Sequence, residues 1–167
     1  MKKQNIILIG MPGAGKSSVG VILAKALGYE FIDTDLVIQR REKRLLREII
    51  ADEGNEGFLA IENEVNATLE ADKSVIAPGG SAIYGKEAMA HFKEIGTIVY
   101  LKLSYEDLAK RLGNLKGRGV VLKEGQTLKD LYEERSKLYE KYAEITVDES
   151  GKDIQGTILA LREQIGM

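Results

Sequence analysis

The sequence predicts an α/β fold in which a parallel sheet carries helices on both faces. Two observations lead to this prediction. Short apolar runs rich in β-branched residues alternate with longer segments whose apolar residues recur every three or four positions. The first run, Asn5–Ile9, is almost wholly apolar, as expected for a strand buried on both faces. Strands that alternate with helices run parallel, because each helix returns the chain to the same end of the sheet.

The elements follow in order along the chain. After the first strand, a helix should bury a face made of Val19, Ile22, Leu23, Ala26 and Leu27 and end at Gly28. Another helix is expected around Phe58–Leu69, and two more begin with capping-box patterns at Ser104 and Thr127. A last helix should cover Ile154–Ile165. The remaining strands are expected at Phe31–Asp33, Ser74–Ala77, Thr97–Leu103 and Ile145–Asp148.

Size and composition indicate one compact domain, residues 1–167, with 44% hydrophobic and 30% charged residues. The net charge of −2 gives no electrostatic basis for binding nucleic acid or an anionic membrane. Without cysteine there are no disulfides or thiolate sites, and a single histidine, His91, excludes multi-histidine metal sites. No signal peptide or apolar run of membrane-spanning length is recognisable. We therefore expect a cytoplasmic protein, and a monomer.

The strongest functional signal is Gly10–Ser17, which reads GMPGAGKS and matches the phosphate-binding pattern G-x-x-x-x-G-K-[ST]. A strand precedes it and a helix follows, as the motif requires. Its glycines let backbone N–H groups curl around phosphate oxygens, and the lysine and hydroxyl reach the terminal phosphates and Mg²⁺. A glycine-rich turn of no function is the weaker alternative. The expected nucleotide contacts are Gly13, Ala14, Gly15, Lys16, Ser17 and Ser18.

Two carboxylates follow the second strand, at Asp33 and Asp35. Residues two apart in an extended chain lie on the same side, so both side chains are expected to face the crevice at the carboxyl ends of the strands. One carboxylate is suited to support Mg²⁺ and the other to accept a proton from an attacking hydroxyl. The alternative is a solvated turn with an aspartate as helix N-cap.

The third strand ends in Ala-Pro-Gly79-Gly80-Ser and lacks the acidic residue common at this place in phosphate-loop proteins. This absence moves the Mg²⁺-supporting role toward Asp33. The two glycines allow close approach of the backbone to a ligand, although a tight turn would use them equally well.

Arg135 falls in the middle of an apolar helical stripe that contains Leu128, Leu131, Tyr132, Tyr139 and Tyr142. A guanidinium that faces the interior needs an anionic partner, which is either a carboxylate or phosphate of a ligand or an internal acid such as Glu62. On the glycine-rich loop, about residues 113–125, Lys116 and Arg118 are suited to close over a triphosphate, or are simply solvated.

Taken in order, these residues resemble the shikimate kinase family over essentially the whole chain. The resemblance rests on the phosphate loop, Asp33-x-Asp35, Phe58-x-x-x-Glu62, Gly79-Gly80, Arg118, Glu134-Arg135-x-x-Leu138-Tyr139 and Val147-Asp148. It implies a three-layer P-loop NTPase fold of the nucleoside-monophosphate-kinase type, with a parallel five-stranded sheet. It also implies ATP- and Mg²⁺-dependent phosphorylation of a hydroxyl of shikimate, giving shikimate 3-phosphate and ADP in the pathway to chorismate and the aromatic amino acids.

The resemblance also implies a role for each matching residue. Lys16 would contact the phosphates, Ser17 would ligate Mg²⁺, and Asp33 would hold Mg²⁺ through water. Asp35 would bind the reacting hydroxyl and act as base. The other expected contacts are Gly79 and Gly80 with the substrate, Arg135 with its carboxylate, Arg111 with the adenine and Arg118 with the transferring phosphoryl group.

The chain departs from the family pattern at two positions. Leu59 stands where the family has an arginine that helps to hold the substrate carboxylate, and Ser81 stands where a third glycine is usual. Four arginines in the expected substrate-binding segment, about residues 34–62, are candidates to compensate for Leu59: Arg40, Arg41, Arg44 and Arg47. Leu59 keeps open the alternative of a related kinase that acts on another small hydroxylated metabolite. A further alternative is an ATP-binding sensor without transfer activity, against which Asp35 and Arg118 speak because a sensor needs neither a base nor a lid charge.

Overall fold

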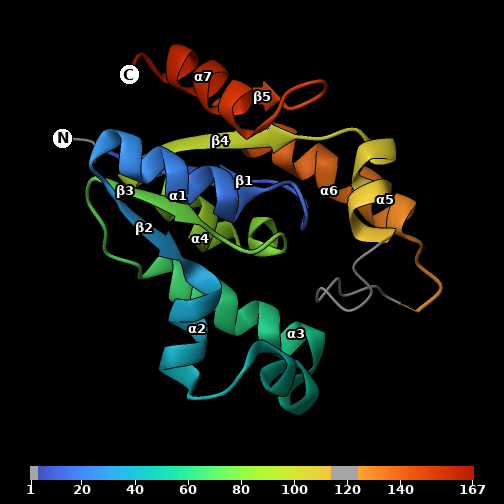
Figure 1. The fold of residues 1–167 in the computed structure, drawn as a ribbon. Coiled ribbons are helices and arrows are strands. Elements are labelled where there is room, and N and C mark those ends of the chain that lie inside the picture. Colours follow the sequence, from blue (N-terminus) through green and yellow to red (C-terminus); the bar gives the residue numbers. More distant parts are fainter. Residues whose placement is uncertain (1–3, 114–123) are drawn as a thin grey trace.

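The computed structural model describes residues 4–113 and 124–167 and shows a three-layer α/β fold (Figure 1). Its sheet has five parallel strands in the order β2-β3-β1-β4-β5. The predicted fold class is therefore confirmed, and each strand begins and ends within one residue of its predicted limits. The strands are β1 (Asn5–Ile9), β2 (Glu30–Asp33), β3 (Ser74–Ala77), β4 (Gly96–Lys102) and β5 (Ile145–Asp148).

Alternate side chains of β1 point into two separate cores. Ile7 and Ile9 belong to the core on the face covered by α4 and α6, and Ile6 and Leu8 belong to the core under α1 and α7. Burial on both faces explains why this strand is apolar throughout. In the described part of the chain the helices are α1 (Lys16–Leu27), α2 (Thr34–Glu42), α3 (Leu46–Ala67), η1 (Ala82–Tyr84), α4 (Lys86–Ile95), α5 (Tyr105–Gly113), α6 (Leu128–Tyr142) and α7 (Ile154–Ile165).

Helix α1 buries part of the predicted face, including Val19 and Leu23, but is turned so that Ile22 lies outside the buried face. Ile22 is 44% exposed, whereas Gly20 and Leu23 are buried. The reason lies at Gly20, where an added Cβ would stand only 2.6 Å from Cε1 of Phe31. Because Gly20 has no side chain, the helix approaches β2 closely on this side, and Ile22 turns to the surface.

Helices α2 and α3 form a lobe at the β2 edge of the sheet, which is the lower part of Figure 1. The two helices pack through a small apolar cluster of their own, made of Ile38, Ile49, Phe58 and Val65. Helix α3 is bent at Gly54, whose φ of 74° and ψ of 177° interrupt the helical conformation. The predicted periodicity around Phe58 thus covers the second half of a longer helix. No helix in the described ranges is long and apolar enough to cross a membrane.

Candidate active site

A cavity of about 530 Å³ lies where β1, β2 and β3 end. These three strands are neighbours in the sheet, so the segments that follow them meet at one edge. The glycine-rich loop after β1, Asp33 at the end of β2 and residues 78–81 after β3 form one side of the cavity. Phe58 and Glu62 of α3 and Arg135 of α6 form the other. The fold therefore brings the segments that follow β1, β2 and β3 together with the predicted residues of α3 and α6.

The loop between β1 and α1 has the backbone conformation that its glycines predict. Gly13 and Gly15 have φ values of 89° and 85°, in the left-handed region that favours glycine. No side chain caps the helix that begins at Lys16, which leaves the N–H groups of its first turn for a ligand. The Lys16 ammonium donates to the carbonyl oxygens of Gly10 at 2.7 Å and Met11 at 2.9 Å. The backbone carbonyl groups of the loop therefore hold the Lys16 ammonium in place.

Burial lowers the pKa of Lys16 to about 8. The positive charge of Arg135 lowers it as well, whereas the carboxylates of Asp35, Glu149 and Asp33 oppose the shift. At pH 7 the side chain still carries its charge, and an anionic ligand would stabilise that charge further. This is the electrostatic state expected of a phosphate-binding lysine.

Most of the predicted nucleotide contacts line the cavity: Gly13, Gly15, Lys16, Ser17 and Ser18. Ala14 does not, because its methyl group is fully buried and its N–H donates to the carbonyl of Met11 at 3.0 Å. Arg111 of α5 lies just outside the cavity and donates to the carbonyl of Gly13 at 3.0 Å. Arg111 is thus held next to the phosphate-binding loop.

Asp33 and Asp35 both line the cavity, but not by strand alternation. Asp33 is the N-cap of α2, and its Oδ1 accepts the N–H of Asp35 at 2.9 Å. The chain has already turned into the helix at Thr34, so the extended geometry used in the sequence argument is wrong here. The N-cap alternative is correct for Asp33, and the same turn directs Asp35 to the cavity. Burial, reinforced by the charge of Asp33, raises the pKa of Asp35 to about 6.

The two glycines after β3 allow charged groups to approach the backbone. A Cβ at Gly79 would lie 3.0 Å from Oδ1 of Asp35 and 3.1 Å from Oε2 of Glu62. A Cβ at Gly80 would lie 2.9 Å from Nη1 of Arg135. The buried Tyr139 fixes this turn, because its hydroxyl donates to the carbonyl of Gly80 at 2.7 Å. The glycines therefore serve close approach rather than a turn alone.

Arg135 is buried, at 5% exposure, as its place in the apolar stripe predicts. Its guanidinium lies 5.6 Å from the centre of the Tyr84 ring, and its Nε has no hydrogen-bond partner. Within residues 4–113 and 124–167 it makes no ion pair, so the internal salt bridge to Glu62 considered above is not formed. Burial raises the pKa of Glu62 to about 7. The arginine thus faces the cavity with a charge that a ligand anion would neutralise.

One acidic residue of this site was missed by the sequence analysis. Glu149 follows β5 directly, is 5% exposed, and has an Oε2 without a hydrogen-bond partner. Burial raises its pKa to about 7, and the charges of Arg111 and Lys16 oppose the rise. The available signal was its position at the carboxyl end of the last strand, the same sheet edge that supplies the other site residues.

The predicted catalytic Arg118 and the neighbouring Lys116 lie outside the described residues, as does most of the predicted lid, about residues 113–125. The single histidine, His91, lies away from this cavity, and its Nε2 is 2.6 Å from the carbonyl oxygen of Leu69.

Comparison with known proteins identifies the family. Residues 12–165 match the family described as shikimate kinase. Shikimate kinase 2 of Yersinia pseudotuberculosis is 35% identical over 154 residues, which cover 87% of this chain and 86% of that protein. The chain belongs to the shikimate kinase family. Membership confirms the predicted P-loop kinase fold and a phosphotransferase that uses ATP with Mg²⁺.

Solved structures of shikimate kinases have the same fold. The enzyme from Acinetobacter baumannii, solved in complex with shikimate, superposes with a TM-score of 0.80 at 33% identity and covers 98% of this chain and 90% of that one. The enzyme from Aquifex aeolicus gives 0.78 at 30% identity, over 98% and 96% of the two chains. The likeness extends over the α2–α3 lobe as well as the sheet.

The residues present fit the Mg²⁺ that the family uses. Ser17 and Asp33 both line the cavity beside the phosphate loop. Across the part of the chain that the structure describes, no group of three or more acidic, histidine or cysteine side chains forms a complete metal site. In kinases, phosphate and water oxygens supply most of the ligands of Mg²⁺, so these two side chains suit the ion.

Proposed function

We propose that this protein transfers the γ-phosphoryl group of ATP to a hydroxyl of shikimate, with formation of shikimate 3-phosphate and ADP. The observation that carries the proposal is that Lys16, Asp35 and Arg135 line one cavity. These residues supply a phosphate-binding cation, a base and a cation for the substrate carboxylate. The complex of the Acinetobacter baumannii enzyme with shikimate supports the choice of substrate.

Asp35 has the properties of the base in this reaction. Its pKa of about 6 leaves the carboxylate ionised at pH 7 and close enough to neutrality to accept a proton. The substrate oxygen attacks the γ-phosphorus, the bond from that phosphorus to the β,γ-bridging oxygen breaks, and the hydroxyl proton passes to Asp35. Because Gly79 has no side chain, this carboxylate lies close to the backbone that follows β3.

Other residues bind and neutralise charge during transfer. Lys16 and the N–H groups of its loop hold the phosphates. Ser17 and Asp33 would hold Mg²⁺, which would supply further positive charge to the triphosphate. We assign Arg111 to the adenine side of the nucleotide. We also assign Arg118 to the transferring phosphoryl group, residues 34–62 to substrate binding and residues 113–125 to the lid.

The proposal includes a monomeric protein in the cytoplasm, which binds a small molecule and neither nucleic acid nor membrane. The net charge of −2 supports the part of the proposal that concerns nucleic acid and anionic membranes. Size-exclusion chromatography with light scattering tests the assembly state.

A coupled assay of ADP release tests the function and separates its alternatives. Shikimate is compared with a panel of other hydroxy acids, polyols and nucleosides at millimolar concentration, with Mg²⁺ and with EDTA. We expect Mg²⁺-dependent ADP release with shikimate well above every other compound. Release with another compound alone identifies a related kinase of a different substrate, which Leu59 favours. ATP binding without release with any compound identifies a sensor.

A further inference from the structure

The position of Leu59 leaves the carboxylate end of the cavity with one arginine fewer than the family pattern. Its side chain does not line the large cavity. It borders a second hollow of about 160 Å³, which adjoins the large cavity because Phe58, Ser81 and Arg135 line both. Because leucine carries no charge, a substrate carboxylate that pairs with Arg135 finds no second cation at position 59. If the substrate carboxylate is to contact two cations, as the family pattern implies, the second cation has to come from another position in the fold.

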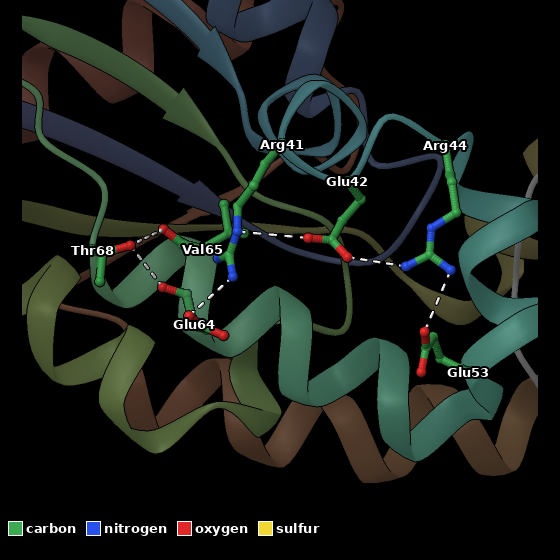
Figure 2. A network of polar contacts seen from close by, with 7 residues as sticks. All are labelled: Arg41, Glu42, Arg44, Glu53, Glu64, Val65 and Thr68. Carbon is green, nitrogen blue, oxygen red and sulfur yellow. Dashed lines mark hydrogen bonds and ion pairs between the residues drawn. The ribbon is translucent and has the colours of Figure 1, made fainter.

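Two of the four candidate arginines are engaged elsewhere. Arg41 pairs with Glu64 at 2.9 Å and lies 3.6 Å from Glu42. Arg44 pairs with Glu42 at 3.0 Å, and its other nitrogen contacts Asp52 and Glu53. Figure 2 shows this network running between α2 and α3, with both guanidinium groups directed at its carboxylates. These two arginines hold the lobe together, and neither lines the cavity.

A third candidate, Arg40, faces a different part of the surface. It borders a shallow hollow with Gln39, Lys43 and Leu45, which shares no residue with the large cavity. Arg40 is therefore not placed to reach a ligand bound near Arg135.

Arg47 is the remaining candidate, and it lines the large cavity. Among the described residues, the cations that line this cavity are Lys16, Arg47 and Arg135. Lys16 belongs to the phosphate loop, which leaves Arg47 and Arg135 for the substrate end. Leu46 and Ile50, on the same face of α3 as Arg47, also line the cavity. The face of α3 that carries Arg47 is thus the face turned to the ligand.

The acids beside Arg47 do not neutralise it. Glu48 accepts the N–H of Leu45 at 3.1 Å, and Asp52 and Glu53 bind Arg44. Within residues 4–113 and 124–167, Arg47 makes no ion pair. An exposed guanidinium at the rim of a cavity, with its neighbouring acids already engaged, is suited to hold a carboxylate through two parallel hydrogen bonds.

We propose that Arg47 supplies the second cationic contact to the substrate carboxylate, in the role that Leu59 leaves open. The inference rests on the proposed function, because it takes shikimate as the substrate. It makes Arg47 a specificity-determining residue that selects substrates with a carboxylate.

Steady-state kinetics of Arg47→Ala test the proposal, with Arg40→Ala as the matched control, because Arg40 is an exposed arginine of the same segment that does not line the large cavity. We expect Arg47→Ala to raise the KM for shikimate roughly 10- to 100-fold, the effect of one lost charge-assisted bond, with kcat and the KM for ATP within about twofold of wild type. Arg47→Lys should raise the KM for shikimate less than Arg47→Ala does, because lysine keeps the positive charge. With shikimate methyl ester, which has no carboxylate, Arg47→Ala should change the KM little. Adding Leu59→Arg to Arg47→Ala should lower the KM for shikimate again.

The outcomes separate the two claims. If wild type releases ADP with shikimate and Arg47→Ala leaves its KM unchanged, the role of Arg47 is refuted and the proposed function stands. The same holds if Arg47→Ala raises the KM for ATP instead, because Arg47 would then serve the nucleotide. If wild type shows no shikimate-dependent release, the proposed function fails and the role of Arg47 fails with it. Circular dichroism verifies that each variant is folded.

Discussion

Ser81 Oγ donates a hydrogen bond of 2.7 Å to Oε1 of Glu62, a carboxylate that is only 2% exposed. The other oxygen of Glu62, Oε2, has no hydrogen-bond partner in the described part of the chain. Burial raises the pKa of Glu62 and the bond from Ser81 lowers it, so the serine stabilises the charged form. The family departure at position 81 therefore acts on Glu62, at the wall of the substrate cavity.

Ser81→Ala should destabilise the protein, because it leaves a buried carboxylate without its partner. We expect a loss of about 1–3 kcal/mol in the free energy of unfolding at pH 8 and a smaller loss at pH 5, where Glu62 is protonated. Urea unfolding at the two pH values measures the difference. Ser18→Ala, at an exposed serine of α1, controls for the substitution itself in the ligand-free protein. Equal losses at both pH values would show that the serine does not act through the charge of Glu62.

Lys16→Ala should remove ATP turnover while the fold persists. The Lys16 ammonium is the cation of the phosphate loop, and loss of one preorganised group of this kind costs about 100-fold or more in kcat. Activity is measured by ADP release and the fold by circular dichroism. Lys25→Ala, at the exposed end of the same helix, is the control and should behave as wild type. Turnover within a few-fold of wild type in Lys16→Ala would contradict the phosphate-loop assignment.

Asp35→Asn should lower kcat by about 10²–10⁴-fold, the usual contribution of a positioned acid–base group, with little change in the KM for ATP. Asp33→Asn should instead raise the Mg²⁺ concentration needed for half-maximal activity. Both effects are read from the same assay as Mg²⁺ is titrated. A loss of ATP or Mg²⁺ affinity in Asp35→Asn, with kcat preserved, would exchange the roles of the two carboxylates.

The fold was predictable because the sequence patterns that indicate its strands and helices each lie within one short segment of the chain. An uninterrupted apolar run such as Asn5–Ile9 is explained by burial on both faces, and that burial is present. The orientation of α1 was not predictable from periodicity alone. It depends on the contact between Gly20 and Phe31, two residues that only the folded chain brings together.

Site residues were predictable where a local sequence pattern fixes their position. They were less predictable where their role depends on contacts between residues far apart in the sequence. The phosphate loop and the buried Arg135 were found from spacing and from a helical stripe. Glu149 was missed because its position after the last strand places it at this sheet edge but does not show whether its side chain is buried or solvated. The role of Ser81 depends on a contact with Glu62, 19 positions away.

Glu149 makes the stability of the ligand-free protein depend on pH. The folded state keeps its proton up to about pH 7, whereas an unfolded glutamate releases it near the ordinary value of 4.5. Between these values the folded state binds more protons, so this group lowers the free energy of unfolding as the pH rises through the window. The stability cost is absent below about pH 4.5 and fully present above about pH 7.

Glu149→Gln removes this cost, because glutamine resembles the protonated acid in shape and carries no charge. We expect the variant to match wild type near pH 4.5 and to be more stable at pH 8, on the order of 2 kcal/mol. Urea unfolding of the ligand-free proteins at several pH values gives the comparison, with Glu94→Gln at the exposed surface of α4 as the control. If Glu149→Gln is instead destabilised at pH 8, the attraction of the ionised Glu149 to Arg111 and Lys16 outweighs its burial. Its pKa would then lie below the ordinary value, and the sign of the pH dependence would reverse.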